Sequence, residues 1–366
     1  MDVIHILWSG EIGGKERAVY QLVRHQIGHS RFTPAVAFCQ AHGPYVQKVR
    51  ELGCTIVDLQ MRSGADITAL PAIISKLRPY HLHHFHSAEP TVMLGSSLCR
   101  GAKRFYTHRG GQPSFNLRQR LKYRFLGLLL RSHFAGLSAN TRHATFSGSC
   151  LTGIPVQRWT VTYNGMDFRL LEPKVDPGVI AGAHGLLPNQ RTIIGTTAHL
   201  RSWKRIEYLL QACATLPKTE FQILIVGDGP DRGRLETIAH SLGLGSNTVF
   251  AGMQTDIGAY LAVMDIFVLP SGPQESFGNS AIEAMAVGLP TVVFSDGGGL
   301  PEHVQDAHTG YVVDSVGELS SRLNQLLSNP DLRTTLGETA ATHIQSTYDL
   351  NAMTSCYDAF YRSHTS

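Results

Sequence analysis

The sequence predicts an α/β protein in which two doubly wound parallel sheets form two lobes. Short apolar runs alternate along the chain with amphipathic segments, which is the pattern of parallel strands joined by helices on both faces of a sheet. The chain has 366 residues, which is enough for two domains that each bury a core of their own.

The first lobe is predicted from apolar runs that are separated by amphipathic stretches and by glycine and proline. Prolines and glycines cluster between residues 165 and 190, and this cluster predicts the boundary between the lobes. Strands are expected at residues 3–8, 34–39, 54–59, 81–87, 103–107, 134–138 and 159–163, and helices at residues 44–52, 67–77 and 114–133 and over a segment that ends near residue 27.

The second lobe is predicted to contain strands at residues 221–226, 248–253, 265–269 and 291–294. A proline- and glycine-containing loop follows the apolar run 265–269. A helix is expected to begin between Phe277 and Ser280 and to end by Gly288. This geometry directs free backbone N–H groups away from the carboxyl end of the strand, where a phosphate binds well.

Two glutamates accompany this predicted anion site. Glu275 lies in the loop and Glu283 lies in the helix behind it. Carboxylates do not favour a phosphate, so we expect them to bind a neighbouring group. Sugar hydroxyls suit them, because a carboxylate accepts strong hydrogen bonds from hydroxyl groups. The alternative is a solvated loop acid and an ordinary helix residue.

The stretch 270–290 contains Glu-Ser-Phe-Gly and then Glu-Ala-Met-Ala-x-Gly-x-Pro, and it resembles the E-x7-E signature of the retaining glycosyltransferases of family 4. The resemblance covers nearly the whole chain and is strongest between residues 192 and 312. It implies the GT-B arrangement, in which two Rossmann-like lobes face a deep interdomain cleft. By resemblance, residues 1–168 form the acceptor-binding lobe, on which residues 349–366 pack, and residues 169–348 form the donor-binding lobe.

The resemblance assigns roles to the residues of the signature. It implies that Glu283 holds the ribose hydroxyls of a nucleotide-sugar and that Glu275 holds the donor sugar close to its anomeric carbon. The backbone at Phe277, Gly278 and Asn279 would cradle the sugar and the distal phosphate.

The diphosphate of the donor needs cationic or N–H partners, because its burial is otherwise costly. The family usually supplies an arginine and a lysine. Lys204 matches the lysine, whereas His199 stands at the arginine position, and Arg201 is the next candidate for that charge. The loop at Met253 follows a predicted strand, and the family recognises the base there largely through backbone. Uridine and guanosine donors therefore both stay open.

A glycine-rich loop follows the first predicted strand. Its glycines stand at positions 10, 13 and 14, and the second strand, residues 35–40, has no acid at its end. This spacing does not fit a dinucleotide fingerprint, so we reject nicotinamide binding there. By resemblance, Gly13 and Gly14 lie near the donor phosphates and the acceptor. A tight turn without a ligand is the alternative.

Histidines end two strands of the first lobe. Four occur between residues 81 and 86, and alternation along a strand places His84 and His86 on one face. No Cys, Asp or Glu follows at ligand spacing, so we predict no metal site. By resemblance, His86 and Arg109 lie on the acceptor side, and His108 is the catalytic candidate of this lobe. A buried, hydrogen-bonded histidine is the alternative for His108.

The predicted helix 114–133 contains five basic residues that do not fall on one helical face. Related enzymes with lipid-linked acceptors dock through this part of the lobe, so contact with an anionic membrane is one hypothesis. A solvated and partly packed helix is the other. The bases are Arg118, Arg120, Lys122, Arg124 and Arg131.

Composition excludes little but is consistent with this interpretation. The formal net charge of +4 is mild and is not concentrated in a tail, which does not favour nucleic acid. No C-x-x-C pair, signal peptide or apolar run near the ~20 residues of a membrane span occurs, so we expect reduced thiols in a cytoplasmic protein. The six cysteines are Cys39, Cys54, Cys99, Cys150, Cys213 and Cys356.

The resemblance implies a retaining, metal-independent glycosyltransferase without a cofactor, which uses a UDP- or GDP-linked sugar. A glycan, a lipid-linked molecule or a small molecule would be the acceptor, in cell-surface polysaccharide, lipopolysaccharide or glycolipid assembly. Association with the inner face of the membrane belongs to the docking hypothesis. Two alternatives stay open: a nucleotide-sugar 2-epimerase on the same fold, and a non-catalytic subunit that binds a nucleotide-sugar.

Overall fold

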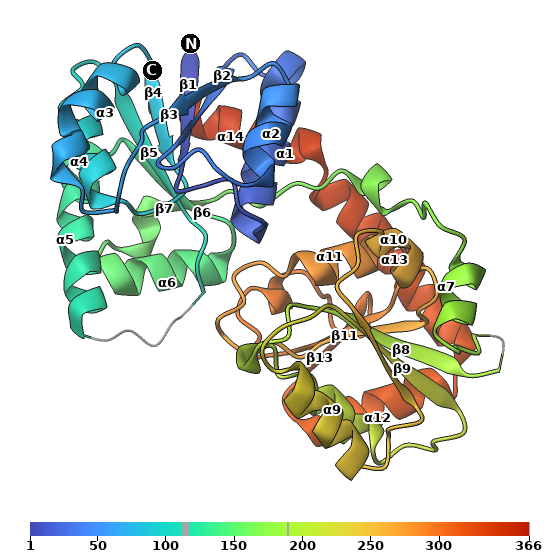
Figure 1. Cartoon of the computed structure of the whole chain (residues 1–366). Helices are drawn as coiled ribbons and strands as arrows, with labels where there is room; N and C mark the ends of the chain where they lie inside the picture. The colour runs from blue at the N-terminus through green and yellow to red at the C-terminus, as the bar shows by residue number, and fades with distance from the viewer. Residues whose placement is uncertain (112–116, 189, 366) are drawn as a thin grey trace. The chain divides into compact units, whose positions relative to one another are not determined.

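The computed structural model describes residues 1–111, 117–188 and 190–365 (Figure 1). The chain divides into two compact units. The first unit contains Met1–Met166 and Tyr348–Ser366, and the second contains Asp167–Thr347. No helix of the described residues is long and apolar enough to cross a membrane.

The first unit is built on a seven-stranded parallel sheet with the strand order β3-β2-β1-β4-β5-β6-β7. The order reverses between β1 and β4, so the chain leaves the carboxyl ends of these two neighbours in opposite directions. The strands are β1 (Asp2–Leu7), β2 (Thr33–Phe38), β3 (Thr55–Asp58), β4 (Leu82–Phe85), β5 (Lys103–His108), β6 (Gly136–Ala139) and β7 (Trp159–Val161).

Helices cover both faces of this sheet because side chains alternate along each strand. In β1, Ile4 and Ile6 pack into the core under α3, α4 and α5, whereas Val3 and Leu7 pack under the helices of the other face, α1, α2 and α14. The helices are α1 (Gly14–His29), α2 (Pro44–Glu51), α3 (Leu70–Leu77), α4 (Pro90–Ser97), α5 (Leu117–His133), α6 (Arg142–Thr152) and α14 (Leu350–Arg362).

The C-terminal helix α14 is part of the first unit although it follows the second in sequence. It contacts α1, and its buried side chains Met353, Tyr357, Phe360 and Tyr361 complete the apolar cluster around Phe105. Asp349 caps the helix by accepting a hydrogen bond from the backbone N–H of Ala352.

The second unit is built on a six-stranded parallel sheet with the strand order β10-β9-β8-β11-β12-β13. Its order reverses between β8 and β11. The strands are β8 (Thr192–Thr197), β9 (Phe221–Val226), β10 (Thr248–Gly252), β11 (Ile266–Leu269), β12 (Thr291–Phe294) and β13 (Gly310–Val313), and the helices are α7 (Pro177–Ala183), α8 (Ile206–Cys213), α9 (Arg232–Ser241), α10 (Ile257–Leu261), α11 (Asn279–Ala286), α12 (Val316–Leu327) and α13 (Pro330–Thr347).

The two parallel sheets with flanking helices confirm the predicted fold class. Some boundaries differ. The first helix continues past residue 27 to His29, with a kink where Ile27 leaves helical geometry and Gly28 takes a φ of 89°. The predicted helix 67–77 begins with a 3-10 turn over Ile67–Ala69. Residues 114–116 of the predicted helix 114–133 lie outside the described residues, and α5 begins at Leu117.

Candidate functional site

The corner between β11 and α11 places the glutamate signature at the strand reversal of the second sheet. Gly278 precedes the first residue of α11 and has a φ of 82°, which favours glycine. A Cβ atom at this position would lie 2.2 Å from a side-chain carbon of Leu300. The backbone therefore turns here in a way that a larger residue would prevent.

Glu275 and Lys204 form a buried ion pair in this corner. Nζ of Lys204 lies 2.5 Å from Oε2 of Glu275, and the two side chains are about one-tenth exposed. Lys204 ends a 3-10 turn, Ser202–Lys204, and its ammonium group lies 4.5 Å from the centre of the Trp203 ring. The backbone N–H of Gly272 donates to the carbonyl of Trp203, and this bond fixes the turn against the glutamate loop.

Hydrogen bonds from residues 299–303 hold the backbone of the loop that contains Glu275 and Phe277. The backbone N–H of Gly299 donates to the carbonyl of Glu275 at 2.9 Å. Nε2 of His303 bonds to the carbonyl of Phe277 at 2.8 Å, and burial lowers the pKa of His303 to about 4. A neutral His303 therefore donates this bond. The sequence interpretation missed His303, because a histidine just after a predicted helix start carries no distinctive pattern.

Glu283 is buried in α11, at 4% exposure, so it is not a solvated helix residue. Three hydroxyls near the same strand ends are buried without a hydrogen-bond partner among the described residues: those of Thr196 and Thr197 at the end of β8, and that of Ser271 after β11. Buried polar atoms are nearly always paired, so these hydroxyls indicate a place for a polar ligand or water. They too were missed by the sequence interpretation.

The remaining predicted donor residues are exposed. His199 and Arg201 are exposed after β8, and Met253 is 73% exposed after β10. In the described part of the chain, no ion pair involves Arg201. The neighbouring Arg205 forms two hydrogen bonds to Asp296, at 2.8 and 2.9 Å. The structure therefore brings Lys204 and Glu275 together and leaves His199, Arg201 and Met253 at the surface.

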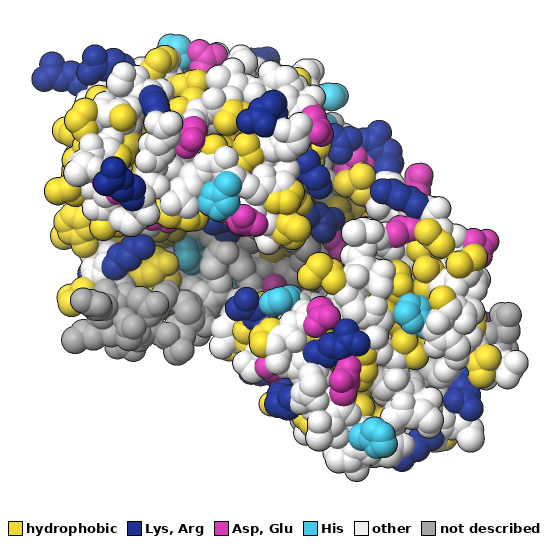
Figure 2. Space-filling model, viewed as in Figure 1, with side chains coloured by type: hydrophobic (Ala, Val, Ile, Leu, Met, Phe, Trp, Pro, Cys, Tyr) yellow, Lys and Arg dark blue, Asp and Glu magenta, His cyan; other side chains and the backbone are white. Residues whose placement is uncertain are grey.

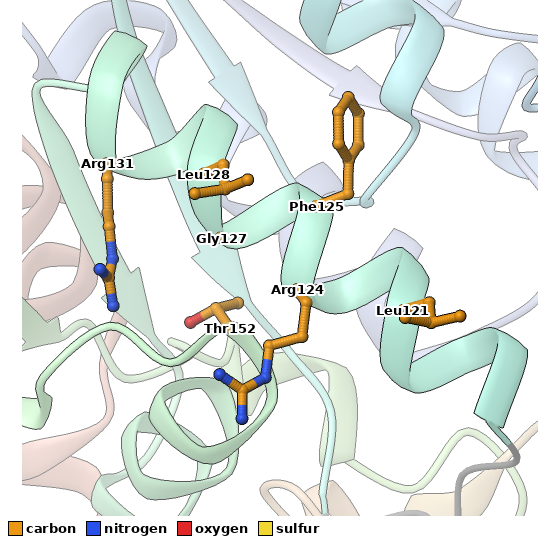
Figure 3. Close-up of a pocket in the computed structure, with 7 residues that line it drawn as sticks. All are labelled: Leu121, Arg124, Phe125, Gly127, Leu128, Arg131 and Thr152. Atoms are coloured by element: carbon orange, nitrogen blue, oxygen red, sulfur yellow. The ribbon is translucent and has the colours of Figure 1, made fainter.

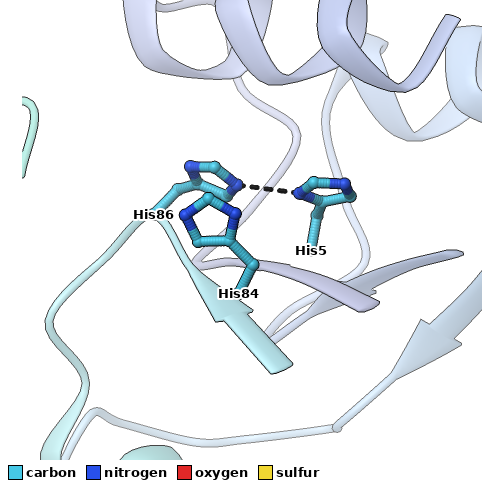
Figure 4. A group of neighbouring side chains, drawn as sticks. All are labelled: His5, His84 and His86. Atoms are coloured by element: carbon cyan, nitrogen blue, oxygen red, sulfur yellow. Dashed lines mark hydrogen bonds between the residues drawn. The ribbon is translucent and has the colours of Figure 1, made fainter. Parts of the chain in front are cut away.

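A second polar group lies in the first unit, where β1 and β4 run side by side. His5, His84 and His86 offer nitrogens that lie within 4.8 Å of one another (Figure 4). Nδ1 of His5 lies 3.0 Å from Nε2 of His86, and Nε2 of His5 lies 2.8 Å from Oε1 of Gln26. His84 bonds to the hydroxyls of Tyr361, at 2.6 Å, and Thr107, at 2.7 Å.

These bonds occupy every ring nitrogen of the three histidines, since Nδ1 of His86 accepts from Arg109 at 3.4 Å. Burial lowers the pKa of His5 to about 4 and holds the pKa values of His84 and His86 well below their usual range, with Arg109 adding to each effect. The cluster is a network of neutral rings beside a cation, which is a poor environment for a metal ion. His86 is buried at 2% exposure, so we expect it to influence a ligand only through its hydrogen bond with Arg109.

His108 ends β5 and is buried at 6% exposure. Its Nδ1 lies 3.2 Å from the hydroxyl of Tyr106, while its Nε2 has no hydrogen-bond partner among the described residues. Burial lowers its pKa to about 4. A neutral ring with one free nitrogen can donate or accept a hydrogen bond to a substrate, which suits orientation better than charge stabilisation.

Gly13 and Gly14 form the start of α1. Gly13 precedes the helix in extended geometry, and a Cβ atom there would lie 2.4 Å from Oε2 of Glu16. Glu16 in turn pairs with Lys15 at 3.2 Å. Gly13 thus leaves room for the carboxylate of Glu16, which lies in the first turn of α1.

The outer surface of α5 carries apolar side chains next to arginines. Leu121, Phe125 and Leu128 are 62%, 54% and 64% exposed. They line a shallow pocket of about 360 Å³ together with Arg124, Gly127, Arg131 and Thr152, in which the two arginine side chains point toward Thr152 (Figure 3). Hydrophobic side chains are also frequent on the side of the first unit that contains α3, α4 and α5 (Figure 2).

Comparison with known sequences gives a family match in the second half of the chain and relatives that align with part of the chain. Residues 183–343 match the family model described as "Glycosyl transferases group 1". N-acetyl-alpha-D-glucosaminyl L-malate synthase of Bacillus anthracis is 30% identical over 203 residues, which cover 54% of this chain and 52% of that protein. D-inositol 3-phosphate glycosyltransferase of Mycobacterium sp. (strain JLS) is 32% identical over 180 residues, 47% of this chain and 40% of that protein.

A third relative is the lipopolysaccharide core biosynthesis glycosyltransferase LpsE of Rhizobium meliloti (strain 1021). It is 32% identical over 157 residues, which cover 42% of this chain and 45% of that protein. The chain spans about half the length of the curated relatives it matches.

Comparison with solved structures covers nearly the whole chain. Anabaena Alr3699/HepE in complex with UDP superposes with a TM-score of 0.86 and 19% identity, over 99% of this chain and 100% of that one. WaaG, described as a glycosyltransferase involved in lipopolysaccharide biosynthesis, gives a TM-score of 0.71 and 17% identity over 97% and 98%. At these identities the likeness shows the fold alone.

Because several histidines are buried and have lowered pKa values, we predict that the free energy of unfolding decreases at acidic pH. An unfolded histidine titrates at 6.5, whereas the folded pKa values of His5, His83, His108 and His303 are lowered to about 4. The unfolded state therefore binds more protons between these values, and the free energy of unfolding falls from pH 6.5 toward pH 4. Each group contributes a loss of about 1.4 kcal/mol per pH unit.

Urea unfolding at pH 7.0, 6.0 and 5.0 measures this slope. Replacement of His84, whose pKa burial holds well below 6.5, by asparagine should reduce the slope by the contribution of one group. His81→Asn is the matched control, because His81 is exposed at the start of the same segment. An identical slope for His84→Asn and the wild type would contradict the assignment.

Proposed function

We propose that the chain is a glycosyltransferase of family 4 with the GT-B fold, and that it transfers a sugar from a nucleotide-sugar to an acceptor hydroxyl with retained anomeric configuration. One observation supports this most strongly: the buried Glu275–Lys204 pair and the buried Glu283 share one strand–helix corner. Carboxylates suit sugar hydroxyls, and a lysine and helix N–H groups suit phosphate.

We infer that the donor is linked to UDP. Anabaena Alr3699/HepE, which shares the fold, has been solved with UDP, with UDP and glucose, and with UDP-glucose. In the proposed complex Glu283 accepts hydrogen bonds from the ribose, and the backbone of Phe277, Gly278 and Asn279 cradles the sugar and the distal phosphate. Met253 marks the loop that recognises the base through its backbone.

Donor binding requires Lys204 to change partners. In the structure its charge is compensated by Glu275. A diphosphate is a stronger partner, because it carries more charge and more acceptor oxygens than a carboxylate. We propose that the diphosphate takes over Lys204 and that the released Glu275 accepts hydrogen bonds from the donor sugar. Arg201, which is exposed after β8, is the second cation of this proposal.

The proposed chemical step is a front-side displacement. The acceptor oxygen forms a bond to the anomeric carbon, the bond from that carbon to the phosphate oxygen breaks, and the acceptor proton moves to the leaving phosphate. Lys204 and backbone N–H groups stabilise the charge that develops on the diphosphate. His108, with Gly13 and Gly14, orients the donor sugar and the acceptor. No metal or cofactor takes part in the proposal.

We propose a cytoplasmic site of action and an acceptor in cell-surface glycan assembly. The six cysteines are free, which is typical of a reducing compartment. The relatives include a protein described by its role in lipopolysaccharide core biosynthesis. A glycan, a lipid-linked acceptor and a small molecule all remain within this proposal, while nucleic acid has no place in it.

Contact with an anionic membrane is a further part of the proposal. Residues 90–166 contain eleven Lys and Arg and no Asp or Glu. The exposed apolar residues Leu121, Phe125 and Leu128 lie within this stretch, at helical spacing along one side of α5. A cationic surface with apolar side chains is the combination that binds the interface of an anionic bilayer.

Replacement of Glu283 by alanine should raise the KM for the donor and lower the rate, because the ribose loses a charged acceptor. A loss of about tenfold or more in kcat/KM is expected for a hydrogen bond to a charged group. Nucleotide release in the presence of acceptor measures it. Glu338→Ala, on the exposed face of α13, is the matched control. Unchanged kinetics of Glu283→Ala would refute the ribose assignment.

The same assay separates the two alternatives. A 2-epimerase would convert the nucleotide-sugar without acceptor and without accumulation of free nucleotide. A non-catalytic subunit would bind the nucleotide-sugar but would neither hydrolyse it nor transfer its sugar to any acceptor.

Charge reversal on α5 should abolish binding to anionic vesicles. Sedimentation with vesicles that contain phosphatidylglycerol measures the bound fraction, and Lys48→Glu with Arg50→Glu on the exposed face of α2 provides the matched control. Undiminished binding would exclude this surface. The variant reverses Arg118, Arg120, Lys122 and Arg124.

A further inference from the structure

Arg109 lies where a ligand of the first sheet is expected. It follows β5 directly, and its side chain reaches His86 at the end of β4, next to the strand reversal between β1 and β4. In open parallel sheets, ligands bind outside the carboxyl ends of the strands at such a reversal. Arg109 is half-buried.

Arg109 has three hydrogen-bond partners among the described residues, and all three are neutral. Its Nε–H donates to Nδ1 of His86 at 3.4 Å, one terminal nitrogen donates to Oδ1 of Asn164, and the other donates to the hydroxyl of Tyr357 at 2.8 Å. A guanidinium group has five N–H donors. Two of them, one on each terminal nitrogen, therefore have no acceptor in the part of the chain that the structure describes.

The histidines behind Arg109 are held in the form that accepts its bond. An arginine can only donate, so Nδ1 of His86 carries no proton. A neutral His86 then carries its proton on Nε2 and donates to Nδ1 of His5. His5 in turn donates from Nε2 to the side-chain oxygen of Gln26. This directed series fixes the position of the guanidinium group without neutralising its charge.

The charge of Arg109 has no counter-ion among the described residues. No ion pair of Arg109 with a carboxylate occurs there, and the stretch of 77 residues that contains it, 90–166, has no Asp or Glu at all. The groups that act electrostatically on His86 are His84, Arg109, His5 and Lys15, which are cationic or neutral. A partly buried charge without a counter-ion is costly, so an anionic ligand would stabilise this arrangement.

Two other polar atoms near the ends of β4 and β5 are buried without a partner in the described part of the chain. They are Oγ of Ser87, which follows His86, and Nε2 of His108, which precedes Arg109. Ser87 is 9% exposed and His108 is 6% exposed. Each can form a hydrogen bond, while the two remaining N–H groups of Arg109 match the oxygens of a carboxylate or a phosphate.

We propose that Arg109 is the centre of an oxyanion-binding site and that the acceptor carries a carboxylate or a phosphate that this site recognises. The identification of the bound molecule as the acceptor rests on the proposed sugar transfer. The anion site itself does not depend on that proposal. The arginine positions the acceptor through its anionic group, while a hydroxyl elsewhere on the same molecule receives the sugar.

Arg104 provides an internal comparison. It lies on the same strand, β5, and its partners are also neutral, but they are the carbonyls of Ser96 and Cys99 at the end of α4. The carbonyl end of a helix carries partial negative charge that offsets a cation. Arg104 is therefore compensated within the fold, whereas Arg109 faces imidazole, amide and phenol groups.

Calorimetric titration of the full chain with inorganic phosphate and with malonate tests the site. The titrations are run with and without saturating UDP, which occupies the proposed donor site and prevents phosphate from binding there. We expect Arg109→Gln to weaken the affinity of at least one of the two anions by about tenfold or more, the loss typical of a charge-assisted hydrogen bond. Arg104→Gln should leave the affinity unchanged, and the better of the two anions identifies the acceptor group.

Any one of three other results would overturn the inference. It is wrong if neither anion binds the wild type, if Arg109→Gln binds as the wild type does, or if Arg104→Gln is equally weakened. Should Arg109→Gln not fold, Arg109→Lys decides, because it keeps the charge but loses the planar fork, and unchanged affinity would then contradict the site. Absence of UDP binding would count against the proposed function, and the anion titration without UDP would still decide this inference.

Discussion

A buried charge needs a partner, and this constraint governs both candidate sites. In the second unit, Lys204 and Glu275 are both nearly buried and compensate each other at 2.5 Å. In the proposed donor complex, a diphosphate replaces the carboxylate as the partner of Lys204. In the first unit, Arg109 has only neutral hydrogen-bond partners among the described residues, and the proposed anionic ligand would compensate its charge.

The strand reversals explain why these groups lie where they do. Each sheet reverses its order once, between β1 and β4 in the first unit and between β8 and β11 in the second. At each reversal, polar side chains follow the carboxyl ends of neighbouring strands. Glu275 follows β11 and Lys204 follows β8, whereas His86 follows β4 and Arg109 follows β5. The fold thus creates one polar corner per unit, and the residues at each corner decide which ligand it suits.

The fold was predictable from local patterns, while the pairing of side chains was not. Alternating apolar runs located most strands, since burial on both faces makes each strand a short apolar segment. The strands β8 and β13 were not predicted. The Glu-x7-Glu spacing located Glu275 and Glu283, but the contact of Glu275 with Lys204 joins positions 71 residues apart and needs the sheet order.

Other features of the sites left no trace in the sequence. The hydrogen bond from His303 to the backbone of Phe277 and the unpartnered hydroxyl of Ser271 depend on loop geometry. Alternation correctly placed His84 and His86 on one face of their strand, but the approach of His5 requires β1 and β4 to be neighbours. The roles assigned to the site residues stay predictions.

Thermal unfolding in the presence of UDP, GDP, ADP and their sugar conjugates, for the wild type and Glu283→Ala, tests the central claim most directly. A ligand at about 100 times its Kd stabilises the folded state by about 2.7 kcal/mol. The account predicts that UDP and a UDP-sugar raise the unfolding temperature of the wild type and raise that of Glu283→Ala much less. No shift with any nucleotide, or an equal shift in both proteins, would contradict a donor site built around this glutamate.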